Sequence, residues 1–398
     1  MGPIPGKLSS GIILLLAAAL ITPQTALGFN FQDVVKKAKE LAAKPYKAPE
    51  STPGFLTSLS YDQFRKIRFD PEASLWRASD SNFQVMLVAP GLFFRHIVAI
   101  HVVDAAGVHK VPFRKKTFAW PSEAIKKRVP EDLGYAGFKL TYPLNAPDVQ
   151  NQFLVFAGVS YFRGVGRDQR FGLSARGIAV DTGLAGGEEF PVFTDFWLVR
   201  PRPNAHALRF YALLDGPSLT GAYQFIVHPG ESTTLEVQAE LFLRQDIALL
   251  GFAPLTSMFY YGRNTPRPSN MWRGAIHDSN GLLIHSNTGE WLWHPLINPP
   301  SLKTEYFEAN SPKGFGLMQR ERGFRVYQDA EARYDKRPSA WVEPQNDWGK
   351  GHVVLVKIPT DSETNDNIVA FWTPGEATKA GNHYTINYTL GFGDEGMT

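Results

Sequence analysis

The chain has 398 residues, of which 43% are hydrophobic and 20% are charged, and its formal net charge is +3. This length allows one large core or two domains, and the composition is that of a soluble globular protein, not of a disordered or membrane protein. Because the charges nearly balance and no basic run alternates with aromatic residues, the sequence does not support nucleic-acid binding. The chain contains no cysteine, which excludes disulfides, cysteine metal ligands and thiol nucleophiles.

The N-terminus has the pattern of a secretory signal peptide. Residues 12–21 form a run of ten apolar residues, whereas a transmembrane helix needs roughly 20, which disfavours an uncleaved anchor. Small residues at Ala26 and Gly28 fit cleavage after Gly28. We therefore expect residues 1–28 to be removed and the mature chain to reach the periplasm in soluble form. Since no twin-arginine pair precedes the apolar run, the general secretion route is favoured.

Two short helices are predicted near the start of the mature chain. Asp33 is the expected N-cap of a helix that runs through Leu41 and ends near Pro45. A second helix is expected around residues 123–127.

Most of the remaining chain alternates between strands and turns. Residues 96–103 and the turn at 104–107 predict a hairpin, and strands at 208–214 and 223–227 flank another turn. Residues 234–243 alternate apolar and polar side chains, as an antiparallel strand with one buried face does. The expected buried side chains are Leu235, Val237, Ala239, Leu241 and Leu243. With 35 Gly and 29 Pro and no regular alternation of strands with helices, the sequence predicts an all-β fold, a large antiparallel β-sandwich with a short N-terminal helix.

Residues 258–372 are rich in aromatic, polar and glycine residues. The motifs are HDSNGL (277–282), GEWLWHPL (289–296), GFGLMQR (314–320), KRPSAWVEP (336–344), DWGKG (347–351) and ETNDNIVAFW (363–372). Loops of this kind suit a carbohydrate cleft, because sugars offer hydroxyls for polar contacts and C–H faces for stacking. The alternative is that the same residues are turn formers and core filler, which is the more common role of a single Trp.

These motifs resemble the periplasmic glucan biosynthesis protein G/D family. Further matching stretches lie upstream, at SYFRGVG (160–166), GLSARG (172–177) and GEEFP (187–191). The resemblance covers the chain from about Phe29 to about Tyr384, and the predicted signal peptide suits the G branch. It implies a galactose-mutarotase-like β-sandwich, a periplasmic location and a glucan with a β-1,2-linked backbone.

The chain departs from the family pattern in two places. Members usually continue into a smaller immunoglobulin-like C-terminal domain, and we expect this chain to lack that domain. We expect the sandwich to span residues 29–390, followed by a tail at 391–398. The second departure is Asn280, where many relatives are expected to carry Asp.

Cleavage of a glycosidic bond usually needs two carboxyl groups. The carboxyl candidates in the motif-rich half are Asp278, Glu290, Glu343, Asp347, Glu363 and Asp366. The resemblance points to Asp366 as the general acid and Asp278 as the base of an inverting reaction, with Glu363 raising the pKa of Asp366 by like-charge proximity. The alternative for each carboxylate is a turn cap, since Asp-Ser-Asn-Gly is good turn chemistry.

Aromatic and arginine side chains are the expected sugar contacts. We expect Asp278 and Asp366 to face one groove, which is lined by some of Trp291, Trp293, Trp341, Trp348 and Tyr334. The predicted substrate-binding residues are Trp291, Trp293, Arg320, Tyr334, Arg337, Trp341 and Trp348. His277 either tunes Asp278 or bonds to the backbone, and the second is the commoner role. No metal-ligand spacing and no phosphate-binding loop occurs, so neither a metal nor another cofactor is implied.

Two functions remain open at this point. One is an endo-acting β-1,2-glucanase of glucan biosynthesis, which the carboxylates Asp278, Glu363 and Asp366 favour. The other is a non-catalytic protein that binds or shapes the glucan delivered by the membrane glucosyltransferase. The β-glucan partner is the same in both, and the oligomeric state is not predicted.

Overall fold

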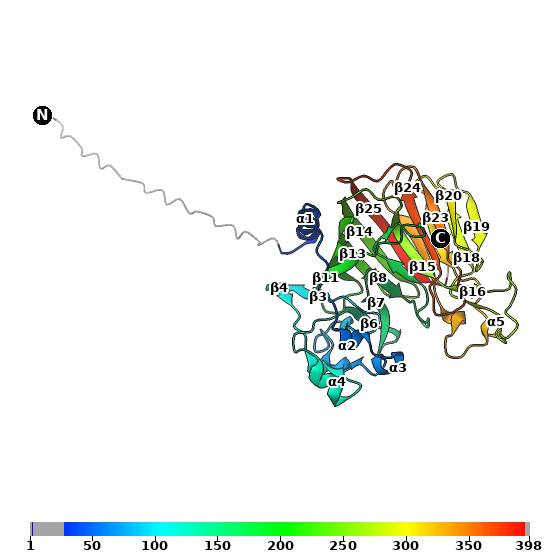
Figure 1. The fold of residues 1–398 in the computed structure, drawn as a ribbon. Coiled ribbons are helices and arrows are strands. Elements are labelled where there is room, and N and C mark those ends of the chain that lie inside the picture. Colours follow the sequence, from blue (N-terminus) through cyan, green and yellow to red (C-terminus); the bar gives the residue numbers. More distant parts are fainter. Residues whose placement is uncertain (1, 3–27, 395–398) are drawn as a thin grey trace.

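The structure is a computed structural model that describes residue 2 and residues 28–394 (Figure 1). The predicted signal peptide, apart from Gly2 and Gly28, lies outside the described residues, as does the last part of the predicted tail. Within the described residues, no helix is long and apolar enough to cross a membrane.

Two large sheets form the body of the molecule. In spatial order, the strands of the 11-stranded sheet are β19 (Trp291–Pro295), β18 (Gly281–His285), β21 (Gly314–Met318), β22 (Ser339–Pro344), β25 (His383–Gly393), β14 (Thr233–Leu243), β13 (Leu219–His228), β12 (Leu208–Asp215), β11 (Val192–Val199), β3 (Ala99–Asp104) and β4 (Gly107–Lys110). Those of the 10-stranded sheet are β2 (Gln84–Val88), β6 (Gly137–Ala146), β7 (Val149–Ala157), β8 (Tyr161–Gly164), β9 (Ser174–Arg176), β15 (Leu250–Ser257), β24 (Ile368–Pro374), β23 (Gly351–Lys357) and β20 (Lys303–Glu308), with β10 (Ala179–Val180) paired to β15.

The predicted β-sandwich is confirmed. One continuous apolar core takes side chains from both sheets. The strand pairs are antiparallel except for β3 and β11, which run parallel because the chain between them crosses to the other sheet. Two small ribbons, β1 (Arg68–Phe69) with β5 (Phe118–Ala119) and β16 (Phe259–Tyr261) with β17 (Ile276–His277), complete the strands.

Strand β14 has the register that its alternation predicts. Leu235, Ala239 and Leu241 expose no surface, and Val237 and Leu243 expose 3% and 4%. The intervening side chains, such as Gln238, reach the outer face. The turn between β12 and β13, the hairpin of β3 and β4 and the helix near 123 also form where the sequence predicts them.

The first helix, α1 (Phe31–Ala42), packs on the outer face of β12, β13 and β14. Its N-cap is Asn30, not Asp33 as expected. The Asn30 side chain accepts from the backbone N–H of Gln32, and Asp33 accepts in return from the Asn30 backbone N–H, which makes Asp33 the second half of a capping box. The remaining helical turns are α2 (Gly54–Thr57), α3 (Tyr61–Phe64), α4 (Glu123–Arg128), α5 (Phe324–Tyr327), η1 (Pro71–Ala73), η2 (Lys115–Thr117) and η3 (Tyr334–Lys336).

Two sequence expectations need correction at the level of the fold. Trp348 is a core residue, 8% exposed, whose ring contacts Phe252, Trp372 and Tyr388, so it does not face a ligand. The last strand, β25, continues to Gly393. Residues 391–393 therefore belong to the sheet and not to the tail expected from residue 391.

The register of β14 gives a direct stability test. Leu241→Ala deletes buried methyl groups and leaves a cavity, so we expect a loss of about 2–5 kcal/mol in the free energy of unfolding, measured by urea denaturation. Gln238→Ala, three residues away on the outer face, should change stability by no more than about 0.5 kcal/mol. Equal losses from both variants would contradict the assignment of the two faces.

Candidate active site

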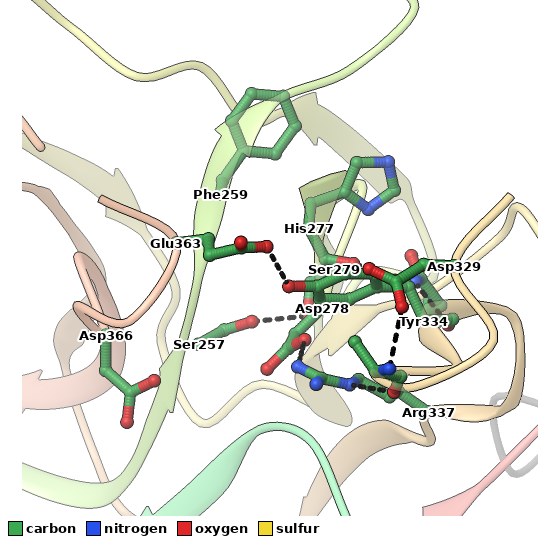
Figure 2. Close-up of polar contacts among 12 residues, drawn as sticks. Ser257, Phe259, His277, Asp278, Ser279, Asp329, Tyr334, Arg337, Glu363 and Asp366 are labelled. Atoms are coloured by element: carbon green, nitrogen blue, oxygen red, sulfur yellow. Dashed lines mark hydrogen bonds and ion pairs between the residues drawn. The ribbon is translucent and has the colours of Figure 1, made fainter. Parts of the chain in front are cut away.

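The first candidate carboxylate, Asp278, follows the short strand β17 and is almost completely buried. Its side chain exposes 3% of its surface and forms an ion pair with the Arg337 guanidinium (Figure 2). The Asp278 backbone N–H donates to the Met258 carbonyl at 2.8 Å, which continues the pairing of β16 with β17. The next residue is fixed as well, because the Ser279 and Ser257 hydroxyls are 2.8 Å apart and both fully buried. Asp278 therefore projects from a rigid backbone.

Arg337 and Tyr334 come from one turn, η3, which lies against this backbone. The guanidinium carbon of Arg337 lies 4.1 Å from the centre of the Tyr334 ring, a cation–π contact. The Tyr334 side chain is 3% exposed, and its hydroxyl donates to a Glu363 oxygen at 2.7 Å (Figure 2). This turn therefore links Asp278 to Glu363 through two side chains.

Glu363 is held as a carboxylate. Arg273 donates to its two oxygens at 2.8 and 2.9 Å, a bidentate arrangement, and also to Asp329 at 2.7 Å. The Arg273 hydrogen bonds lower the pKa of Glu363, and the Tyr334 hydroxyl acts in the same direction. A carboxylate held in this way is an anchor for its loop and a poor proton donor, in contrast to the catalytic role expected for Glu363.

Asp366, three residues further on, has a different environment. The neighbouring Asn367 is 2% exposed, and its amide bonds to both backbone groups of Phe259 and to the Ile358 carbonyl, which pins the loop. The Asp366 side chain is 32% exposed and accepts from Arg163 at 3.1 Å.

Burial raises the pKa of Asp366, Arg163 offsets this in part, and the negative charge of Asp278 raises the pKa further. The pKa of Asp366 is therefore raised, as predicted, but the causes are burial and the charge of Asp278. Glu363 does not supply it, because Arg273 already neutralises that carboxylate. In Figure 2, Asp366 and Arg337 lie on opposite sides of Asp278.

The sequence did not single out the residues that surround Asp366 from β8 and β9. Arg163 pairs with it directly, and the Arg176 guanidinium, 4% exposed, lies 4.7 Å from the Tyr161 ring centre and pairs with Glu188. The signal was available, since all of these residues belong to the motifs at 160–166, 172–177 and 187–191. Three arginines, including Arg337, thus act on the pKa of Asp366.

Among the described residues, the His277 ring forms no hydrogen bond with a carboxylate, and its Nε2 lies 3.5 Å from the Asn280 amide nitrogen. His277 is fully buried, its ring stacks on Phe259 with centroids 5.3 Å apart, and its carbonyl accepts from the Gln319 side chain. Burial lowers its pKa to about 4, so the imidazole is neutral near pH 7. Across residues 28–394 there is no cluster of three or more His, Asp or Glu side chains that could hold a metal ion.

The expected aromatic contacts gather at a separate place. A cavity of about 570 Å³ lies on the face of the 11-stranded sheet that points away from the core, and we call it the aromatic pocket. Its lining residues are Leu283, Trp291, Trp293, Met318, Gln319, Arg320, Arg322, Ser339, Trp341 and Asp394. Asp278, Asp366, Tyr334 and Arg337 are not among them. Of the five rings from which the groove lining was expected, Tyr334 lies beside the carboxylates, Trp291, Trp293 and Trp341 line the aromatic pocket, and Trp348 lies in the core.

Glycines on the neighbouring strands let the rings of the aromatic pocket lie flat on the sheet. A Cβ atom at Gly314 would lie 2.4 Å from the Trp341 ring, and one at Gly281 would lie 2.4 Å from the Trp293 ring. Trp291, 51% exposed, stacks on His285 at 4.0 Å and lies nearly parallel to Trp341 at 5.8 Å. The Trp291 ring is thus a preformed platform.

Arg320 and Asn280 connect this pocket to the HDSNGL motif. The Arg320 guanidinium lies 4.7 Å from the centre of the Trp293 ring. The Asn280 side-chain oxygen accepts from the backbone N–H groups of Arg320 and Glu321 at 2.7 and 3.0 Å. A carboxylate oxygen accepts the same two bonds, so Asn at this position keeps the turn and removes one negative charge.

Two solved structures match the chain loosely. An α-galactosidase of family GH36 from Geobacillus stearothermophilus matches 66% of this chain and 40% of its own, with 8% identity and a TM-score of 0.32. A galactose mutarotase related enzyme from Lactobacillus acidophilus matches 66% of this chain and 97% of its own, with 8% identity and a TM-score of 0.28. These superpositions are too loose to transfer any property to the chain.

Sequence comparison is much more specific. The family model described as "Periplasmic glucan biosynthesis protein, MdoG" matches residues 29–398. Glucans biosynthesis protein G from Ralstonia nicotianae is 46% identical over 379 residues, which are 95% of this chain and 75% of the relative. The matched region contains both candidate carboxylates, the arginines around them and the aromatic pocket. The chain belongs to the MdoG family of periplasmic glucan biosynthesis proteins.

Proposed function

We propose that this protein hydrolyses β-1,2-linked glucan in the periplasm by an inverting, endo-acting mechanism, with Asp366 as the general acid and Asp278 as the general base. The observation that supports this proposal most strongly is that Asp366 and Asp278 have different electrostatic environments within one site. Burial raises the pKa of Asp366, which suits a proton donor, whereas Asp278 is paired with a guanidinium.

The proton movements follow from these environments. Asp366 donates its proton to the oxygen of the breaking glycosidic bond. A water molecule attacks the anomeric carbon from the opposite face and gives its proton to Asp278, so one C–O bond breaks and one forms. Arg163 and Arg337 then hold the two carboxylates in place. Glu363, fixed by Arg273 and Tyr334, orients the loop that carries Asp366.

Binding of the glucan chain is assigned to two places. Tyr334 and Arg337 are proposed to contact sugar beside the carboxylates, and the aromatic pocket is proposed to hold a further stretch of the chain. There, Trp291 offers an exposed ring face, and Arg320 offers guanidinium N–H donors beside the Trp293 ring.

A second candidate function is supported by the burial of Asp278. A general base must reach the attacking water, yet this side chain exposes only 3% of its surface and is already engaged by Arg337. A protein that binds and shapes the glucan released by the membrane glucosyltransferase needs no accessible base. The two functions share the aromatic pocket and differ in whether the glucan is shortened.

The decisive experiment is cleavage of linear β-1,2-glucan by the purified protein, followed by size analysis of the products. Asp366→Asn keeps the side-chain shape but removes the proton donor, so we expect the cleavage rate to fall by about 10²–10⁴-fold, with glucan binding retained. Asp246→Asn is the matched control, because Asp246 is an exposed carboxylate paired with Lys379. Cleavage by Asp366→Asn at the wild-type rate would exclude Asp366 as the acid, and a wild-type protein that binds the glucan without shortening it would establish the binding function.

The raised pKa of Asp366 also predicts a pH dependence. Only the protonated acid is active, so kcat/KM should decline as pH rises through this pKa. Arg163 lowers that pKa, and Arg163→Met should therefore raise it and move the decline to higher pH. The control is Arg77→Met, which removes a similarly exposed arginine that pairs with Glu72. An unchanged pH profile for Arg163→Met would show that another group controls the decline.

The aromatic pocket makes a separate prediction for binding. Trp291→Ala removes the exposed ring, and we expect the Kd for a long linear β-1,2-glucan to rise about tenfold, equal to about 1.4 kcal/mol, in isothermal titration calorimetry. Tyr306→Ala, which removes a similarly exposed ring (52%) from β20 of the other sheet, is the control. Equal affinity of the Trp291→Ala variant and the wild type would remove the pocket from the binding site.

A further inference from the structure

Gln319 lies directly after β21 and is 2% exposed. Its side-chain amide nitrogen donates two hydrogen bonds, to the His277 carbonyl at 3.1 Å and to the Tyr334 carbonyl at 3.2 Å. Its backbone N–H donates to the Ser339 hydroxyl at 3.0 Å. Gln319 therefore joins the end of β21 to two other segments of the chain, one at His277 and one at residues 334–339.

The two carbonyls belong to the two sides of the proposed site. His277 is the residue before Asp278, and Tyr334 begins the turn that carries Arg337. Gln319 thereby holds the backbone on both sides of the ion pair between Asp278 and Arg337. Each partner of that ion pair lies within three residues of a carbonyl to which Gln319 donates. Figure 2 shows His277, Asp278, Tyr334 and Arg337 in one region of the structure.

Gln319 also lines the aromatic pocket, and the residues beside it extend the connection. Arg322, another lining residue, donates to the Arg337 carbonyl and, at 3.2 Å, to the Ser339 hydroxyl. Three lining residues of the aromatic pocket, Gln319, Arg322 and Ser339, are thus hydrogen-bonded to one another or to the turn that carries Arg337.

We propose that Gln319 is a positioning residue, which sets the orientation of Asp278 relative to Arg337 by holding the two backbone segments that carry them. The inference rests on the proposed function at the same carboxylates, and it assigns to Gln319 no contact with substrate. The essential feature is the pair of N–H donors, since both partners are carbonyl oxygens, which only accept.

Two variants distinguish the effect of losing the N–H donors of Gln319 from the effect of losing its side-chain volume. Gln319→Glu keeps the shape but, when ionised, places a carboxylate against two carbonyl oxygens. When protonated, it regains one O–H donor. Gln319→Ala removes the side chain and cannot titrate. The titratable and charged groups near the position are His277, neutral because burial lowers its pKa to about 4, Tyr334, Arg322 and the Asp278–Arg337 pair.

We expect kcat for β-1,2-glucan cleavage to fall at least about tenfold in both variants. The Kd of the glucan should change less than about twofold, because Gln319 exposes only 2% of its surface and the rings of the aromatic pocket stay in place. The defect of Gln319→Glu should shrink as pH falls, since burial raises the pKa of a carboxyl group, whereas the defect of Gln319→Ala should be the same at all pH values after division by the wild-type profile. A Gln319→Glu variant with the wild-type kcat at high pH would overturn the proposal.

A second measurement does not use enzyme activity, so it tests the positioning role independently of the proposed hydrolysis. Amide hydrogen exchange of the full chain should become faster in the segments 276–280 and 334–338 of Gln319→Glu, with β19 unchanged. Unchanged exchange in both segments would overturn the positioning role whether or not the protein cleaves glucan. Conversely, wild-type cleavage by Asp366→Asn would refute the catalytic assignment alone and leave the exchange result standing. Thermal unfolding of each variant identifies any global loss of the fold, and in that case Gln319→Ser provides the smaller perturbation for the same two readouts.

Discussion

The packing of aromatic rings between the two sheets is the constraint on which the site depends. Phe156 of β7 stacks on Phe162 at 4.6 Å and meets Phe210 and Phe225 of the opposite sheet edge to face at 5.2 and 5.1 Å. Each such pair adds about 0.5–1.5 kcal/mol beyond the burial of its area. Rings that interlock in this way fix the distance and angle between the sheets, so loops that leave the ends of different strands keep a constant relation to one another. The carboxylates come from such loops and need that constancy.

Charge alternation is the second requirement, because the site buries several ionised groups. Arg337 and Tyr334 lie between Asp278 and Glu363, and Arg273 lies between Glu363 and Asp329. Removing a charge from water is costly unless an opposite charge or a hydrogen bond replaces the lost hydration. Within residues 28–394, the buried carboxylates Asp215, Asp278 and Asp335 each pair with a guanidinium. Asp366 has one direct ion pair, with Arg163 at its partly exposed end, and Arg176 and Arg337 lower its pKa without pairing with it, so burial outweighs them and the pKa of Asp366 is raised.

The sequence predicted what depends on local pattern. The alternation of 234–243 determined which face of β14 is buried, because a shift by one residue exposes every aliphatic side chain. The motifs likewise predicted that Asp278 and Asp366 belong to one region.

The sequence predictions that failed depend on how distant segments of the chain lie relative to one another. Trp348 has the same local surroundings in sequence as an exposed Trp, and only the position of β25 and β24 places it in the core. The placement of the aromatic pocket depends in the same way on sheet order, since β19 and β18, which carry Trp291, Trp293 and Leu283, lie at one edge of the 11-stranded sheet. The sequence also gave no reason to prefer Asn30 to Asp33 as the cap, because both are good capping residues and the choice is made by where the chain meets the sheet.

The contrast between Glu363 and Asp366 shows why residue type alone is a weak guide to catalytic role. The two carboxylates lie three residues apart on one loop, and the same motif carries both. Arg273 reaches Glu363 from a segment 90 residues earlier and lowers its pKa, whereas burial raises that of Asp366. Asn367, between Asp366 and β24, keeps the loop from rotating, because its amide satisfies three backbone groups at once. If that anchor were lost, the two carboxylates would sample each other's surroundings and the difference in proton affinity would decrease. The difference in pKa between Glu363 and Asp366 is therefore a property of the hydrogen bonds and ion pairs that hold this loop on the sandwich.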